Sequence, residues 1–222
     1  MRAIADNTLR QALASGLAQM GLALPEAGQQ QLVDYVQLLH KWNAAYNLSA
    51  VRDPLQMVSR HLLDSLTLVD AIDQLPATGN ILDVGTGPGL PGIPLSVYYP
   101  QRQLILLDSN GKKTRFLFQA KLALALDNVQ VVQQRIADYQ PATPVAMVVS
   151  RAFASLRQML EGCDHLGAAH ILAMKGEYPT QELSDLPDNW QLQSARAVTV
   201  PRETAQRHII HLSRHSRETA SA

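Results

Sequence analysis

The stretch ILDVGTGPGLPG, residues 81–92, decides the fold of this chain. Its apolar start predicts a buried strand that carries Asp83 near its end. Gly85, Gly87 and Gly89 follow, and because glycine has no Cβ they permit a tight turn and a close approach of the backbone to a ligand. An acidic strand end and three alternating glycines exceed what a simple turn requires. The stretch therefore predicts a nucleotide-binding loop in an α/β fold.

Outward from this loop, short apolar runs alternate with helical patterns, which is typical of parallel βαβ units. The runs QLQSARAVTV and QRHIIHLSR, separated by PRETA, predict a C-terminal antiparallel hairpin. We therefore expect a Rossmann-like, mostly parallel sheet of about seven strands. The first five expected strands are residues 81–84, 104–108, 129–132, 145–150 and 170–175, and the expected helices between them are 94–99, 112–126 and 156–163.

The first third of the chain predicts helices only. Apolar residues recur at spacings of three and four between residues 9 and 42, and Asp53 followed by Pro54 is typical of a helix start. His61 and Asp64 lie three residues apart on that third helix, where they are candidates to pair with each other. We expect residues 1–75 to form an N-terminal helical extension and residues 76–216 the ligand-binding domain, in one compact unit.

Composition limits the possible environments and partners. Nineteen Lys and Arg balance nineteen Asp and Glu, so a nucleic-acid site must be a local patch. The single Cys163 excludes an internal disulfide and fits a reducing compartment, and we expect a cytoplasmic, monomeric protein. No run is long and apolar enough for a membrane span, and no histidine or cysteine spacing predicts a metal site.

Two cofactor classes fit the loop by its glycines alone. Gly87, Gly89 and Gly92 satisfy the G-x-G-x-x-G pattern, and Asp108 follows at the distance of a ribose-binding acid in a dinucleotide dehydrogenase. The register favours the other class. The strand is expected to end at Val84, which places the turn at Gly85 and leaves no glycine at the third position of the pattern.

Proline and charge also argue against a diphosphate. Pro88 and Pro91 each lack an N–H group that a diphosphate needs, and the carboxylate of Asp83 would repel it. The same carboxylate favours the amino or sulfonium group of S-adenosyl-L-methionine, which carries no phosphate. Asp108 is then expected to accept hydrogen bonds from the ribose hydroxyls. The sequence therefore predicts a methyltransferase.

The chain resembles the bacterial 16S rRNA (guanine-N7) methyltransferases once called glucose-inhibited division protein B. The stretches that carry this resemblance are NLSAVRDP, RHLLDSL, ILDVGTGPGLPGIPLS, LLDSNGKKTRFL, VSRAFASL and AMKG, between Asn47 and Gly176. The resemblance implies a class I methyltransferase fold and, as partner, 16S ribosomal RNA or the small ribosomal subunit. It also implies a cofactor site that includes Gly85, Leu90, Ile136, Ala137 and Arg151. Ala137 stands where the family more often has glutamate, so we expect a backbone contact there.

The chemistry of guanine N7 predicts a sparse catalytic apparatus. N7 offers a lone pair and has no proton to lose, so attack on a sulfonium methyl group needs alignment rather than a general base. We predict no catalytic side chain except Arg151, a candidate for positioning. Its guanidinium is suited to the cofactor carboxylate, the guanine O6 edge or a phosphate, and the sequence leaves these three open. Cys163 lies inside an expected helix and is predicted to be a core residue rather than a nucleophile.

Basic residues in three regions are candidates to contact RNA, although each is also compatible with an ordinary solvated surface. These candidates are Arg52, Arg60, Lys112, Lys113 and Lys175. Two other functions are weighed against methyl transfer. One is a nicotinamide-dependent oxidoreductase, which rests on glycine spacing alone, and the other is a non-catalytic RNA-binding protein that retains the fold.

Overall fold

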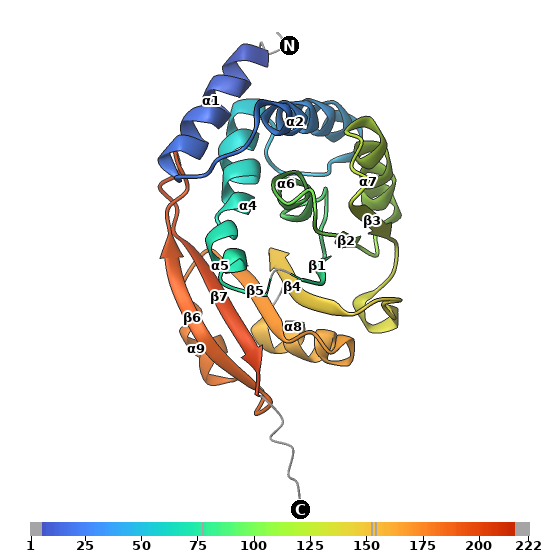
Figure 1. Ribbon diagram of the computed structural model, residues 1–222, viewed down its shortest axis with the longest axis vertical. Coiled ribbons are helices and arrows are strands. Elements are labelled where there is room, and N and C mark those ends of the chain that lie inside the picture. Colours follow the sequence, from blue (N-terminus) through green and yellow to red (C-terminus); the bar gives the residue numbers. More distant parts are fainter. Residues whose placement is uncertain (1–5, 77, 152, 154, 216–222) are drawn as a thin grey trace, which may run out of the picture.

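The strand order of the sheet places the glycine-rich loop near its centre. The computed structural model describes residues 6–76, 78–151, 153 and 155–215, and these form a seven-stranded sheet in the order β3-β2-β1-β4-β5-β7-β6 (Figure 1). The strands are β1 (Asn80–Val84), β2 (Leu104–Leu107), β3 (Val129–Val132), β4 (Val145–Arg151), β5 (His170–Lys175), β6 (Trp190–Val198) and β7 (Arg207–Arg214). Residues 1–5 of the expected extension, and residue 216 of the expected domain, lie outside the described residues.

Parallel and antiparallel pairing follow the predicted pattern. β1 pairs in parallel with β2 and β4, whereas β7 pairs antiparallel with both β5 and β6. All five expected parallel strands and the C-terminal hairpin are confirmed, with ends within a residue or two. Because the parallel strands end at one edge, the residues that follow β1, β2, β4 and β5 gather there. That edge holds both cavities described below.

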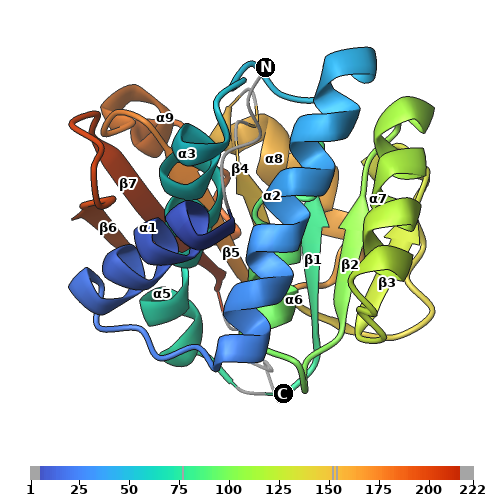
Figure 2. The same cartoon turned by 90° about the horizontal axis from the view of Figure 1, so that it is seen from above.

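Helices cover both faces of the sheet (Figure 2). The first face packs on α6 (Gly92–Tyr98), α7 (Gly111–Ala123) and the N-terminal helices, and the second packs on α8 (Leu156–Cys163). Ile81 joins the first core and Leu82 the second, as the alternation of side chains along a strand requires. A short helix, α9 (Thr180–Ser184), follows β5 and was not predicted.

The N-terminal helices share one core with the sheet. They are α1 (Asp6–Gln19), α2 (Glu26–Tyr46), α3 (Pro54–Met57), α4 (Asp64–Leu66) and α5 (Val69–Asp73). Leu13 and Leu39 belong to the same buried cluster as Ile81 and Met147 of the sheet. The division of the chain near residue 75 stays a prediction. None of the helices in the described ranges is long and apolar enough to cross a membrane.

The predicted third helix contains a π-helical turn. Asp53 caps its start, with the side chain accepting a hydrogen bond from the Leu55 N–H at 3.1 Å, as expected. The helix then widens into a π turn over Val58–Leu63 before α4 begins. Such turns often occur at functional sites. This one carries Arg60 and His61, and Asp64 follows it directly.

Candidate functional site

The glycine-rich loop has the left-handed backbone that the sequence predicts. Gly85, Gly87 and Gly89 have φ values of 68°, 62° and 100°. A Cβ at Gly85 would meet no atom within 4 Å, so the loop faces open space there, whereas a Cβ at Gly89 would lie 2.5 Å from Ile93 Cδ1. Gly89 therefore lets the loop pack on α6, and Gly85 leaves room for a ligand.

Asp83 lies beneath this loop. Its Oδ2 accepts hydrogen bonds from the Thr86 hydroxyl at 2.6 Å and from the Gly92 N–H at 2.7 Å. Its Oδ1 is buried and has no hydrogen-bond partner among the described residues. Burial raises the pKa of Asp83 to about 7, although the two hydrogen bonds and the charge of Arg151 act in the opposite direction. This carboxyl group first of all holds the loop in shape.

The start of α6 offers no site for a diphosphate. Its first N–H, that of Gly92, donates to Asp83, and the next, that of Ile93, donates to the Gly89 carbonyl oxygen at 2.7 Å. Pro94 has no N–H, and the Leu95 N–H donates to the Pro91 carbonyl oxygen. A dinucleotide fold needs these donors for its pyrophosphate. The start of α6 therefore lacks the free N–H donors that a nicotinamide dinucleotide needs, and the glycine spacing alone does not support that alternative.

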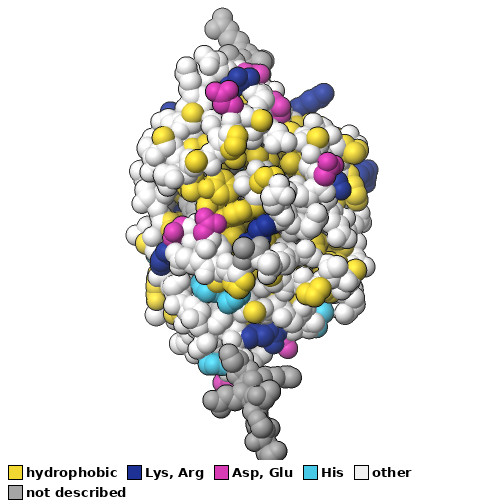
Figure 3. Space-filling view, viewed as in Figure 1, with side chains coloured by type: hydrophobic (Ala, Val, Ile, Leu, Met, Phe, Trp, Pro, Cys, Tyr) yellow, Lys and Arg dark blue, Asp and Glu magenta, His cyan; other side chains and the backbone are white. Residues whose placement is uncertain are grey.

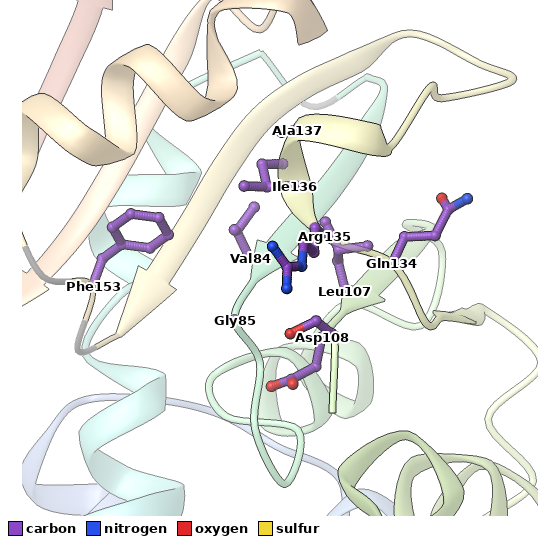
Figure 4. A pocket seen from close by; sticks show the side chains of 10 residues that line it. Val84, Gly85, Leu107, Asp108, Gln134, Arg135, Ile136, Ala137 and Phe153 are labelled. Carbon is purple, nitrogen blue, oxygen red and sulfur yellow. The ribbon is translucent and has the colours of Figure 1, made fainter. Parts of the chain in front are cut away.

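A cavity of about 440 Å³ opens beside the loop, and we call it the Asp108 cavity. Figure 4 shows Asp108 beside Gly85, with Ile136 and Phe153 around the hollow. Its lining residues are Val84, Gly85, Leu107, Asp108, Ser109, Gln134, Arg135, Ile136, Ala137 and Phe153. Four of the predicted cofactor residues therefore line one cavity: Gly85, Asp108, Ile136 and Ala137.

Asp108 is anchored without exhausting its capacity as an acceptor. Its Oδ2 accepts from the Gly87 N–H at 2.9 Å and its Oδ1 from the Asn110 N–H at 2.8 Å. Lys113 Nζ lies 3.5 Å from Oδ2. A carboxylate has about four lone-pair sites, so this fixed group can accept further hydrogen bonds from a ligand. Lys113, predicted as an RNA contact, lies here beside the acid of the cavity.

Sequence reasoning assigned no role to Phe153. It lies two residues after the end of β4 and lines the Asp108 cavity, where its aromatic ring is an apolar surface for a planar ligand. The signal was its position in VSRAFASL, three residues beyond the expected strand end at Ser150 and two beyond Arg151. Leu90, by contrast, is predicted from the resemblance but lies buried in the core on the other side of the loop.

A second cavity, of about 510 Å³, lies on the other side of the loop, and we call it the Arg151 cavity. Its lining residues are Leu48, Ser49, Ala50, Val51, Arg60, His61, Asp64, Pro88, Arg151, Met174, Lys175, Gly176 and Arg207. Of the predicted cofactor residues only Arg151 lines it. The two cavities meet the loop at Gly85 and Pro88, so they are separated by the turn itself.

Arg151 is held by a buried carboxylate. Its Nη1 lies 3.1 Å from Asp64 Oδ2 and donates to the Arg60 carbonyl oxygen at 3.0 Å. Asp64 Oδ1 accepts from Arg207 Nε at 2.8 Å. The suggested pairing of His61 with Asp64 is therefore wrong. His61 instead contacts Ser49, and Asp64 bridges Arg151 of β4 and Arg207 of β7.

His61 supports the loop that forms one wall of the Arg151 cavity. Its Nε2 lies 2.7 Å from Ser49 Oγ, and Asn43 Nδ2 donates to the carbonyl oxygens of Ser49 and Val51. Burial, followed by the charge of Arg151, lowers the pKa of His61 to about 4. The imidazole is therefore neutral near pH 7 and acts as a structural support for residues 48–51.

The predicted RNA contacts lie in different places. Arg52 donates to the Asn43 carbonyl oxygen at the end of α2, and Lys112 is exposed at the start of α7. Arg60 pairs with Glu203 at 3.2 Å, and Lys175 pairs with Glu182 at 2.8 Å. Arg60 and Lys175 both line the Arg151 cavity. Arg60 and Lys175 therefore belong to the candidate site, whereas Arg52 and Lys112 lie outside both cavities.

Other candidates for reactive groups are the cysteine and the possible metal ligands among the described residues. Cys163 is buried, and burial raises its pKa to about 12, so the thiol is a core group as predicted. Within the described ranges, no group of three or more His, Cys, Asp and Glu side chains is placed to hold a metal ion. The expected lack of a metal stays a prediction.

A family model described as rRNA small subunit methyltransferase G matches residues 28–210. The chain belongs to this family. Ribosomal RNA small subunit methyltransferase G of Marinobacter nauticus is 48% identical over 207 residues, which cover 92% of this chain and 95% of that protein. The protein of that name from Pseudomonas aeruginosa is 49% identical over 204 residues, with 91% and 94% covered.

Solved structures of other methyltransferases share the fold. TrmN from Thermus thermophilus aligns with a TM-score of 0.55 and 16% identity, over 71% of this chain and 53% of that one. Magnesium protoporphyrin IX methyltransferase from Synechocystis, bound to S-adenosylhomocysteine, aligns with a TM-score of 0.55 and 14% identity, over 82% and 97%. Membership of the rRNA small subunit methyltransferase G family confirms the predicted family, enzyme class and cofactor, S-adenosyl-L-methionine. The nicotinamide alternative is wrong.

Proposed function

We propose that this member of the rRNA small subunit methyltransferase G family binds S-adenosyl-L-methionine in the Asp108 cavity and methylates N7 of a guanine in 16S ribosomal RNA. The observation that carries the proposal is the joint placement of Asp108, Ile136 and Ala137 around one cavity beside the open turn at Gly85. Three separate segments of the chain, which sequence reasoning assigned to one cofactor, meet there. We propose the cytoplasm as the place of this reaction.

The residues of the cavity fit the adenosine part of the cofactor. Asp108 has acceptor capacity for the two ribose hydroxyls, and the side chains of Val84, Ile136 and Phe153 supply an apolar setting for adenine. At about 440 Å³ the cavity lies within the usual range of ligand pockets, roughly 300–1,000 Å³. Asp83, buried below the loop, holds the turn that borders this cavity through its hydrogen bonds with Thr86 and Gly92.

The chain's own groups fit a reaction that needs no general base. When bound, the cofactor supplies an electrophilic methyl group on its sulfonium. Among the ionisable groups that line the Arg151 cavity, Asp64 bridges two arginines and Lys175 pairs with Glu182. Guanine N7 has no proton to remove, so these residues need only bind and orient the base and exclude water.

Recognition of the RNA rests on local groups. In the space-filling view, basic and acidic side chains are scattered among apolar ones, and no large area of one sign covers the described part of this face (Figure 3). The formal net charge of zero agrees with this pattern. We therefore assign RNA contact to the cations around the Arg151 cavity, and to shape, rather than to a broad electrostatic surface.

Methyl transfer to defined RNA tests the proposal. Small ribosomal subunits that lack the modification are incubated with the protein and S-adenosylmethionine labelled in the methyl group, and the product is probed for N7-methylguanine. Asp108→Asn keeps the volume of the side chain but removes its charge, so we expect cofactor affinity to fall by about tenfold or more. Asp127→Asn, at an exposed position before β3, is the matched control and should bind normally.

The outcomes separate the alternatives. Label at guanine N7 that depends on Asp108 supports the proposal. Label at another atom would overturn the assignment to N7, and equal cofactor affinity of the two variants would overturn the assignment of the Asp108 cavity. Cofactor binding with no transfer to any RNA would favour the non-catalytic, RNA-binding alternative.

A further inference from the structure

The four cations that line the Arg151 cavity differ in how their charge is compensated. Lys175 has its own carboxylate, Glu182, and Arg60 has Glu203. Arg151 and Arg207 instead share the single carboxylate of Asp64. Two positive charges therefore meet one negative charge at this place, and one positive charge is left without a counter-ion among the described residues. Such an excess in a partly enclosed cavity favours a ligand with an anionic or electron-rich oxygen.

The shared carboxylate also fixes the direction of both guanidinium groups. The Asp64 side chain is only 3% exposed, whereas those of Arg151 and Arg207 are 23% and 26% exposed. Arg151 uses Nη1 for its contacts, and Arg207 uses Nε for Asp64 and Nη1 for the Gln206 carbonyl oxygen. Within the described residues, Nη2 of each arginine has no acceptor. Each guanidinium is therefore held from the buried side and keeps donors for a ligand.

Sheet order explains how Arg207 reaches a site that the sequence did not assign to it. Arg207 begins β7, and β7 runs antiparallel to β5. The start of β7 therefore lies at the same edge where β4 and β5 end, and His208 is in register with Lys175. Arg151 ends β4 at this edge. The C-terminal hairpin thus adds a cation to the cluster of strand ends that forms the candidate site.

We propose that Arg207 is a second target-binding residue, which contacts an acceptor oxygen of the target nucleotide together with Arg151, and that Asp64 is the positioning residue that aligns both. The inference rests on the proposed function, because it takes RNA as the ligand of the Arg151 cavity. The acceptor is a phosphate oxygen or the O6 atom of guanine, and both have the chemistry that a guanidinium edge recognises.

The test compares Arg207→Met with Arg214→Met. Arg214 ends the same strand, has the same 26% exposed side chain and also pairs with an aspartate, Asp164, so it controls for the loss of an ion pair on β7. The measurements are the KM and kcat for small ribosomal subunits at several salt concentrations, and the affinity for S-adenosylmethionine by calorimetry. Wild-type activity in the same assay tests the proposed function separately from this inference.

For Arg207→Met we expect KM for the subunit to rise about ten- to a hundredfold, with cofactor affinity unchanged. If the acceptor is a phosphate, the slope of log KM against log salt concentration falls by about one, and Arg207→Lys restores part of the affinity. If it is guanine O6, the slope is unchanged. An unchanged KM, an equal rise in the Arg214 control, or a loss of cofactor affinity would each overturn the inference.

Asp64 is tested through its coupling to Arg207. Asp64→Asn keeps the side-chain volume but removes the shared charge, so both arginines lose their alignment. We expect the double variant of Asp64→Asn and Arg207→Met to raise KM little beyond Asp64→Asn alone. Additive effects on KM would show that Asp64 supports the fold only. If Asp64→Asn does not fold, Asp64→Glu, which keeps the charge, must retain more activity than Arg207→Met for the positioning role to stand.

Discussion

Asp83 shows what strand geometry adds to sequence reasoning. The sequence predicts that the Asp83 carboxylate, at the end of β1, lies beside the amino or sulfonium group of the cofactor. Side chains alternate along a strand, however, so neighbouring residues face opposite sides. Val84 therefore faces the Asp108 cavity, while Asp83 turns under the loop toward Gly92. The hydrogen bond from the Gly92 N–H to Asp83 could not be predicted from the sequence, because it depends on the path of the loop back to the start of α6. The sequence did predict that the start of α6 cannot bind a diphosphate, because prolines remove N–H donors there and the Asp83 carboxylate repels phosphate.

The buried carboxyl group predicts a pH dependence of stability. Burial raises the pKa of Asp83 from 3.8 to about 7, so the folded protein holds a proton between these values that the unfolded chain has released. The folded state gains stability from this proton at low pH and loses it as the pH rises toward 7. We expect a loss of roughly 2–4 kcal/mol from this group between pH 4 and pH 7.

Urea unfolding of the wild type and of Asp83→Asn between pH 4 and pH 8 measures this effect. The variant has no titrating group at this position, so its free energy of unfolding should fall less steeply with pH. Parallel curves for the two proteins would show that the carboxyl group stays ionised in the folded state.

At the scale of elements, α2 contacts the glycine-rich loop directly. The Tyr35 hydroxyl, buried in α2, donates a hydrogen bond to the Pro88 carbonyl oxygen at 2.9 Å. Burial raises the pKa of Tyr35, so this hydroxyl stays protonated and remains a donor. Pro88 also lines the Arg151 cavity. The N-terminal helix α2 therefore helps to fix the position of the glycine-rich loop.

Removal of this hydroxyl is expected to loosen the loop. In Tyr35→Phe the ring is kept, and the Pro88 carbonyl oxygen loses its buried donor, so we expect about 1 kcal/mol less stability and a several-fold weaker affinity for S-adenosylmethionine. Thermal unfolding and calorimetric titration measure the two effects. Tyr98→Phe, on α6 and only partly buried, serves as the control. Normal cofactor affinity in Tyr35→Phe would mean that the loop keeps its shape without α2.

Local signals predicted most elements, and long-range contacts account for what was missed. The strands from β1 to β5 stand out as apolar runs between breakers, and Asp53 marks a helix start because its side chain caps the N–H of Leu55. The π turn was not predicted because apolar spacing continues unbroken through residues 58–63. Asp64 and Arg207 are 143 residues apart in the chain, so their pairing depends on the sheet order, which no local pattern encodes.

In the whole molecule, the two cavities on either side of the glycine-rich loop form one functional edge. The sequence led us to expect several residues of the Asp108 cavity together, because they follow successive parallel strands and such strand ends meet at one edge. It predicted the Arg151 cavity only in part, through Arg60, Arg151 and Lys175. The remaining wall comes from the hairpin and the loop at residues 48–51, which reach this edge only in the assembled fold.

A crystal structure of the protein with S-adenosylhomocysteine tests the central claim most directly. The account predicts the ribose hydroxyls within hydrogen-bond distance of Asp108, the adenine between Ile136 and Phe153, and the sulfur near Gly85, directed toward the Arg151 cavity. A ligand bound elsewhere, with the Asp108 cavity empty, would contradict it.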